Sequence, residues 1–301
     1  MGATRELTRA PSSLGLSLRA AAALVPGASA LPFIAGGGRE IPGLTLTLHG
    51  ARVNGERLAV YARVCGFASS ATLPATAPHL LAFPLHMALM TDGSFPFPAV
   101  GLVHLANRIS LHRAIPAASP LDLSVQATPL EPHPKGRTFT IVSEARIAGE
   151  LVWEEHSTML RRGSTPAPGS SGGDERDGLA ARTQPPSATA AAAEWQLGED
   201  LGRRYAAVSG DRNPIHMHAL SARLFGFPRA IAHGMWTKAR CLAALEAELP
   251  EAYAVDVAFG RPILLPGRVA FTHTREHEQI SFVVSEAQEH TTIHLEGTVT
   301  P

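Results

Sequence analysis

The chain has 301 residues, 45% of them hydrophobic, and a formal net charge of zero. Its length and apolar content suffice for two ordinary cores, which excludes a broadly disordered protein. Balanced charge gives no reason to expect nucleic-acid binding, and no apolar run is long enough to span a membrane. The only cysteines are Cys65 and Cys241. They exclude a disulfide framework and favour a reducing compartment, which we take to be the cytoplasm.

Residues 1–39 are interpreted as an N-terminal extension. They contain an apolar stretch from Leu14 to Leu24 that is interrupted by Ser17 and Arg19 and followed by Pro26-Gly27. This pattern predicts an amphipathic helix that docks on the protein. A transit peptide or a weak signal peptide remains the alternative, because arginines outnumber acids in the segment.

Residues 40–162 show the pattern of a first domain. Apolar and polar residues alternate from Leu44 to Leu48, which predicts a half-buried strand, and Asn54-Gly55 is a turn signal. Helices are expected over 60–66 and 80–90, the second one buried despite Pro84. Strands are expected over 102–111, 121–127, 139–147 and 151–160. A long buried helix followed by strands predicts an α+β domain whose sheet wraps around the helix.

Residues 163–192 are rich in Gly, Ser, Pro and Ala and have no apolar period, so they are expected to be a flexible linker. Residues 193–301 then repeat the earlier order. Residues 197–208 lead into the candidate site segment, a short helix is expected over 219–225 and a long one over 232–249. In the long helix, apolar residues recur at steps of three and four, the spacing of one buried face. Strands are expected over 253–259, 269–274, 279–286 and 292–300.

The two halves also share short matching segments, in the same order and at nearly constant spacing. Residues 61–67 match 205–211, residues 112–115 match 260–263, and residues 142–145 match 284–287. Such an order indicates a duplicated domain. One difference matters for chemistry, because Phe67 stands where the second copy has Asp211. The first copy is therefore expected to lack the catalytic motif.

The segment from Tyr205 to His218 is the strongest candidate site. It places a carboxylate, Asp211, five residues before an imidazole, His216, with Asn213-Pro214 between them. The residue before proline avoids helical angles, so we expect the pair to face each other across a tight loop, as acid/base chemistry requires. Two alternatives remain: Asp211 as a mere turn cap, and a metal site built from nearby histidines. The histidines of that alternative are His216, His218 and His233.

Three short motifs in the second half together give a specific resemblance to a known family. Ser209-Gly-Asp-Arg-Asn-Pro-Ile-His216, with Ala232-His-Gly-Met235 and Arg261-Pro-Ile-Leu-Leu-Pro-Gly267, resembles the signature of the MaoC-like (R)-specific enoyl-thioester hydratases. The two-copy layout resembles the double-hotdog members of that family, including (3R)-hydroxyacyl-thioester dehydratases. The resemblance covers most of residues 40–162 and 193–301. It implies a duplicated hotdog fold, in which each copy is an antiparallel sheet around a central helix.

The resemblance also implies a reaction, the reversible addition of water to a trans-2-enoyl thioester to give the (3R)-3-hydroxyacyl thioester. Asp211 and His216 would be the acid/base partners and Asn213 would help to position the water. Gly234 and His233 would bind the thioester oxygen or the substrate. No cofactor and no metal are implied. The alternatives are a binding module without turnover and a hotdog thioesterase.

The implied substrate is carried by coenzyme A or by an acyl carrier protein, and the sequence leaves this choice open. It also leaves open the acyl chain length and the physiological direction of the reaction. A duplicated hotdog contains both copies in one chain, so a monomer is allowed and a homodimer is equally compatible.

Overall fold

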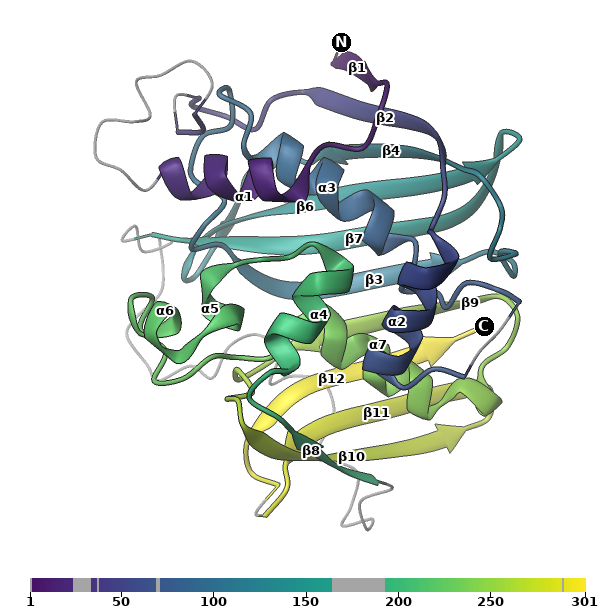
Figure 1. Ribbon diagram of the computed structural model, residues 1–301. Helices are drawn as coiled ribbons and strands as arrows, with labels where there is room; N and C mark the ends of the chain where they lie inside the picture. Colours follow the sequence, from purple (N-terminus) through teal and green to yellow (C-terminus); the bar gives the residue numbers. More distant parts are fainter. Residues whose placement is uncertain (1, 24–33, 37, 69–70, 164–192, 289) are drawn as a thin grey trace.

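A computed structural model of the chain describes residues 2–23, 34–36, 38–68, 71–163, 193–288 and 290–301. The segment 163–192, expected as a linker, lies outside these residues except for Gly163. Within the described part, twelve strands form one curved sheet, and the helices lie on one of its faces (Figure 1). No described helix combines the length and the hydropathy needed to cross a bilayer.

In its described residues, the N-terminal half supplies seven strands and three helices. Its central helix, α3, is apolar along almost its whole length, and Leu80, Leu85 and Leu89 are fully buried against the sheet. The strands of this half are β1 (Ala3–Leu7), β2 (Leu44–Ala51), β3 (Val103–Leu111), β4 (Leu121–Ala127), β5 (Glu131–His133), β6 (Gly136–Ile147) and β7 (Glu150–Arg162), and the helices are α1 (Ser13–Ala22), α2 (Gly55–Cys65) and α3 (His79–Met90).

Over residues 193–288 and 290–301, the C-terminal half supplies five strands and its own central helix, α7. The strands are β8 (Ala193–Leu197), β9 (Tyr253–Phe259), β10 (Gly267–Glu276), β11 (Gln279–Glu286) and β12 (Ile293–Thr300), and the helices are α4 (Leu201–Ser209), α5 (Pro214–Met217), α6 (Ala219–Arg223), α7 (Gly234–Ala244) and the 3-10 turn η2 (Glu246–Glu248).

The order of strands shows the duplication. From the middle of the sheet outward, one half runs β3-β7-β6-β4-β2 and the other runs β9-β12-β11-β10-β8. Each strand of one half has a counterpart in the other half at the same place in the sheet and in the same chain order. The helices α3 and α7 also occupy the same place in the two halves (Figure 1). The two copies meet where β3 pairs antiparallel with β9, with Ile109 opposite Val255. The two halves therefore share one continuous sheet.

Several elements differ from the sequence-based expectation. Asn54-Gly55 is the start of α2 and not a turn, because the side chain of Asn54 accepts hydrogen bonds from the first backbone N–H groups of the helix. The segment before residue 40 contributes β1, which pairs parallel to β2. The edge strand β8 was not expected from the sequence. Both strands are five residues long and lie at the edges, where pairing rather than pattern decides the structure.

The helix expected over 232–249 is shorter. Its regular part ends at Ala244, and the following 3-10 turn moves Leu249 out of the helix. The helix is also buried on more than one face. The sheet covers one side, and on another side the indole N–H of Trp236 donates to the carbonyl of Val64 in α2 at 2.9 Å.

One polar residue of α7 lies entirely inside the protein. Lys238 is 0% exposed, and its Nζ donates to Asn107 Oδ1 at 2.5 Å, to the Asn107 carbonyl at 3.1 Å and to the Val255 carbonyl at 3.1 Å. Burial lowers the pKa of Lys238 to about 7. Because Asn107 and Val255 lie on β3 and β9, this lysine connects α7 by hydrogen bonds to the two strands at which the halves meet.

Replacing Lys238 with Met is therefore expected to lower the free energy of unfolding by about 2–4 kcal/mol, because it leaves buried acceptors without a donor. Urea unfolding measures this change. The matched control is Arg108→Met on β3, whose guanidinium bonds Asp256 across the same junction but in an exposed position. The control should change stability by about 0.5 kcal/mol or less. Equal losses in the two variants would contradict the role given to Lys238.

Candidate active site

The loop between α4 and α5 carries Asp211 and is held by local hydrogen bonds. Helix α4 ends at Gly210, whose φ of 83° lies in the left-handed region that glycine adopts without strain. The buried hydroxyl of Ser209 accepts from the Asp211 N–H at 3.1 Å. Oδ1 of Asp211 in turn accepts from the Asn213 N–H at 3.1 Å. The carboxylate is thus fixed in place, with its other oxygen available.

His216 lies on the short helix α5 and not in an open loop as expected. Asn213 caps that helix, since its Oδ1 accepts from the Ile215 N–H at 3.4 Å, and Pro214 takes the first helical position. The backbone of His216 packs directly on Gly202 of α4. A Cβ at position 202 would lie 1.9 Å from the His216 carbonyl oxygen, so only glycine allows this approach. Asn213 therefore positions Asp211 and His216 through its backbone and side chain.

Three predicted residues converge in space. One carboxylate oxygen of Asp211 and one ring nitrogen each of His216 and His233 lie within 4.8 Å of one another. The two imidazoles stack with centroids 3.7 Å apart, and Tyr205 packs on His233 with centroids 4.9 Å apart. His216 and His233 are buried, whereas the side chain of Asp211 is 28% exposed. A small polar molecule can therefore reach Asp211.

Hydrogen bonds set the tautomers of both histidines. Nδ1 of His216 lies 2.8 Å from the Ile231 carbonyl oxygen, so Nδ1 carries the hydrogen and Nε2 keeps a lone pair. Nε2 of His233 lies 3.0 Å from the Asp211 carbonyl oxygen and therefore donates to it. The other nitrogen of His233, Nδ1, is buried and has no hydrogen-bond partner among the described residues.

Burial and neighbouring charges set the protonation states. Burial lowers the pKa of His216, although Asp211 opposes this shift, and burial together with His216 lowers the pKa of His233 to about 3. Burial alone would raise the pKa of Asp211, but His233, His216 and the Asn213 N–H together lower it. At neutral pH the site thus holds a carboxylate beside a neutral imidazole, both of which accept protons.

The N-terminus of α7 supplies hydrogen-bond donors beside this pair. His233 is the residue before the helix and Gly234 is its first residue, so the first backbone N–H groups have no partner one turn earlier in the helix. These N–H groups and the positive end of the helix dipole can stabilise negative charge on an oxygen. The ring of Phe259 lies against Gly234, and a Cβ there would come within 2.8 Å of it.

Replacing Gly234 with Ala is expected to lower kcat/KM for the hydration reaction by about 100-fold, because a displacement of about 1 Å at a positioned donor has an effect of this size. Steady-state kinetics on a short enoyl thioester measures it. The double variant Gly234→Ala/Phe259→Leu removes the clashing ring and should recover part of the loss. A single variant with wild-type kinetics would contradict the close approach.

The same three side chains also form a possible ligand set for a metal ion. These hydrogen bonds use one nitrogen of each ring and leave Nε2 of His216 and Nδ1 of His233 open, so the feature that favours proton chemistry is the row of N–H donors at the start of α7 beside them. His218, which the metal alternative required, is exposed. The N–H groups at α7 point to an oxyanion as the partner of this site.

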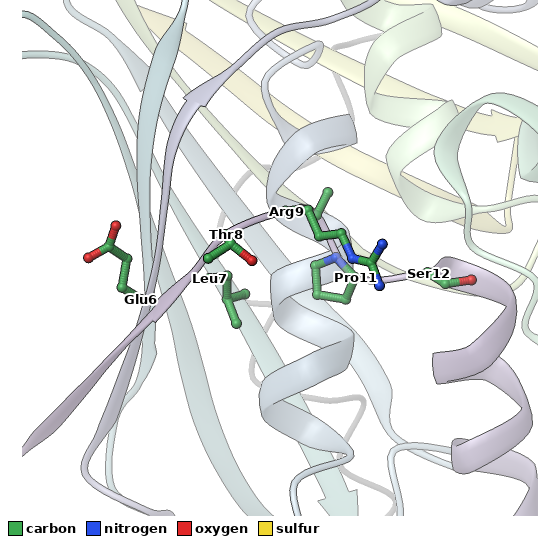
Figure 2. Close-up of a pocket in the computed structure, with 7 residues that line it drawn as sticks. Glu6, Leu7, Thr8, Arg9, Pro11 and Ser12 are labelled. Carbon is green, nitrogen blue, oxygen red and sulfur yellow. The ribbon is translucent and has the colours of Figure 1, made fainter.

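One surface cavity lies away from these residues. It has a volume of about 560 Å³ and is lined by residues 6–12, between β1 and α1. Figure 2 shows its lining running from Glu6 on β1 to Ser12 at the start of α1, and neither Asp211 nor the two histidines belong to that lining.

Comparisons with known proteins identify the family of the chain. The model of the MaoC like domain matches residues 180–297, which contain the whole site. The 3-hydroxyacyl-thioester dehydratase X of Mycobacterium tuberculosis is 34% identical over 261 residues, which are 85% of this chain and 86% of the relative.

Solved structures give the same result for the fold. The crystal structure of HtdX from Mycobacterium tuberculosis superposes with a TM-score of 0.73 at 32% identity, over 85% of this chain and 99% of that one. A MaoC-like dehydratase from Phytophthora capsici superposes with a TM-score of 0.66 at 18% identity, over 85% of this chain and 94% of that one. The likeness confirms the fold class expected from the sequence.

Proposed function

This chain belongs to the MaoC-like family of 3-hydroxyacyl-thioester dehydratases, and we propose that it interconverts trans-2-enoyl and (3R)-3-hydroxyacyl thioesters through Asp211 and His216. The observation that carries this proposal is the convergence of a carboxylate, a neutral imidazole and the free N–H groups of α7. The enzyme is a hydro-lyase of fatty acid metabolism.

Asp211 and His216 hold the reacting water in this proposal. Both are acceptors at neutral pH, so each accepts one O–H of the same water, and the lone pair of the water is directed at C3. As the C3–O bond forms, Nε2 of His216 takes the proton, and the Asp211 carboxylate stabilises the resulting imidazolium. The imidazolium then returns the proton to C2. General acid/base catalysis of this kind contributes about 10²–10⁴-fold.

The electrons of the double bond move onto the thioester oxygen when water adds to C3. The resulting enolate oxygen accepts hydrogen bonds from the backbone N–H of Gly234 and its neighbours at the start of α7. Donors aimed at a developing oxyanion contribute about 10²–10³-fold each, because the site is preorganised and excludes water. Buried His233 supports the loop by donating to the Asp211 carbonyl.

One assay distinguishes this reaction from thioester hydrolysis. Purified protein is mixed with trans-2-butenoyl thioesters of coenzyme A and of an acyl carrier protein, and absorbance of the conjugated double bond is followed beside release of free thiol. We expect the double bond to disappear without thiol release on at least one carrier. Thiol release would favour a thioesterase, and no reaction on either carrier would favour a binding module.

The pH dependence follows from the two acceptors. Both must be deprotonated, and the folded protein lowers the pKa of each, so activity is expected to persist below the ordinary imidazole range. A profile of kcat/KM should be flat at neutral pH and fall only below about pH 6.5. A half-maximal point above pH 7 would contradict a His216 that is held neutral.

We further propose that one chain is a complete catalytic unit, because β3 and β9 already join the two halves. Monomer and homodimer are both compatible with this unit. Cys65 and Cys241 are buried and unpaired, which supports a reducing compartment, the cytoplasm, as the proposed location.

A further inference from the structure

A second group of buried polar side chains lies in the N-terminal half, outside the site described above. We name it the His79 cluster and define it as His79, His86, Asn107, Ser143 and Glu155, each at most 6% exposed. Helix α3 supplies the two histidines, and strands β3, β6 and β7 supply the other three residues. The proposed reaction uses none of these side chains.

The centre of the His79 cluster is an ionised carboxylate. Glu155 is 0% exposed; its Oε2 accepts from His79 Nδ1 at 2.9 Å and its Oε1 accepts from Asn107 at 2.8 Å. Burial alone would raise the pKa of Glu155, but His79, His86 and Asn107 lower it to about 2. A buried ion pair is not needed for stability, because apolar residues can often replace it without loss. Buried ionisable residues with strongly shifted pKa values are instead common at functional sites.

Helix α7 connects the cluster to the proposed active site. Lys238 lies one helical turn after Gly234, and its Nζ bonds Asn107, which in turn bonds Glu155. On the other side, Tyr205 packs on His233 and on Tyr61 of α2. The hydroxyl of Tyr61 donates to Thr76, three residues before His79, at 2.7 Å.

A third connection passes through an aromatic pair. The ring of Phe259, which covers Gly234, lies 4.7 Å from the ring of His104 on β3. Both Asp211 and Glu155 act electrostatically on His104, and burial lowers its pKa to about 4. His104 therefore lies between the proposed active site and the His79 cluster.

Two imidazole nitrogens in this region remain open. Glu155 occupies Nδ1 of His79, and the described residues provide no hydrogen-bond partner for its Nε2. Nε2 of His104 is buried and also lacks a partner in the described part of the chain. Buried polar nitrogens are rarely left unsatisfied, so Nε2 of His104 calls for a partner that the described part of the chain does not supply.

The partner is better explained as substrate than as metal. His79, His86 and Glu155 offer three ligand atoms close together, but those atoms already bond one another or Ser143. The open nitrogens belong to His79 and to His104, whose ring packs on the Phe259 ring that lies against Gly234. In a thioester substrate, the carrier must stay outside the protein, so the acyl end is the part that can extend inward to them.

Resting on the proposed function, we propose that the substrate's acyl group carries a hydroxyl or another oxygen function beyond C3, which binds to Nε2 of His79 and Nε2 of His104. Glu155 orients His79 for this contact, as a carboxylate orients a histidine in other buried pairs. An unsubstituted alkyl chain would leave the buried Nε2 of His104 without a partner, whereas an oxygen within hydrogen-bond distance satisfies it.

Matched substrates test this proposal. Trans-2-enoyl-CoA thioesters of five to ten carbons are compared in pairs, one with a terminal hydroxyl and one without, and the ratio of the two kcat/KM values is taken at each length. Wild-type protein should favour the hydroxyl form by about 10- to 100-fold at one or two lengths, the contribution of hydrogen bonds to a buried site.

The variants isolate the two histidines. His79→Asn keeps an amide donor for Glu155 but removes Nε2, and should lower the preferred ratio by about 10-fold or more. His104→Phe removes the other open nitrogen and should act in the same direction. The control is His156→Asn, because His156 lies on β7 beside Glu155 but pairs with Glu154 at 2.6 Å in a partly exposed position. The control should leave the ratio unchanged.

The ratio is measured within each variant, so partial loss of folded protein does not affect it. A wild-type ratio at or below one at every length would overturn the proposal while leaving the proposed reaction intact. Ratios in both His79→Asn and His104→Phe equal to that of the wild type would overturn it as well. Absence of turnover on every thioester would instead contradict the proposed function.

Discussion

Replacing Asp211 with Asn is expected to lower kcat for hydration by about 10²–10⁴-fold with little change in stability. The amide oxygen can still accept the hydrogen bond from the Asn213 N–H, so the loop keeps its conformation. The neutral amide, however, neither accepts a proton nor stabilises an imidazolium at His216. Steady-state kinetics and thermal unfolding of the same preparation separate these two effects.

The matched control for this change is Asp200→Asn. Asp200 precedes α4, and its side chain is 51% exposed, so the same chemical change occurs outside the site. It should alter kcat by less than twofold. Comparable losses in the two variants, or an active Asp211→Asn protein, would remove Asp211 from the reaction.

Replacing His216 with Asn should cause a loss of similar size, about 10²–10⁴-fold in kcat. The new amide N–H can donate to the Ile231 carbonyl as Nδ1 does now, so the packing of α5 on Gly202 is retained. What is lost is Nε2, the only ring nitrogen of His216 with a free lone pair. The change therefore removes the proposed base without removing the structural hydrogen bond.

His218→Asn is the control for this second change. His218 lies two residues further on, is exposed, and follows the same short helix α5. Its replacement should leave kcat within about twofold of the wild type. A large loss at His218 with little loss at His216 would reverse the assignment and revive the metal alternative considered for these histidines.

Much of the fold could be predicted because the hydrophobic pattern that identifies each element lies within a short stretch of sequence. The alternation from Leu44 to Leu48 and the apolar run of α3 each identify an element without tertiary information. The edge strand β8 could not be identified in this way, because it is ordered by pairing with β10. The end of α7 at Ala244 depends on the 3-10 turn that follows, and no helix-breaking residue marks it.

In the proposed site, too, some residues could be predicted from the sequence and others could not. Asp211, His216 and Gly234 follow from a motif whose members are close in sequence, and the structure brings their elements together. Gly202, Phe259 and Ile231 were missed because their contribution is a backbone approach, a ring contact and a carbonyl acceptor, none of which has a sequence signature. The His79 cluster was missed because Glu155 and His79 are distant in sequence and adjacent only across the sheet.

The central claim is that Asp211 and His216 act on one water as a unit. The measurement that tests it most directly is kcat for the double variant Asp211→Asn/His216→Asn beside the two single variants. Residues that act together show strongly non-additive losses. We predict that the double variant retains activity within about tenfold of the slower single variant. Losses that multiply in full would show that the two side chains act independently and would contradict the account.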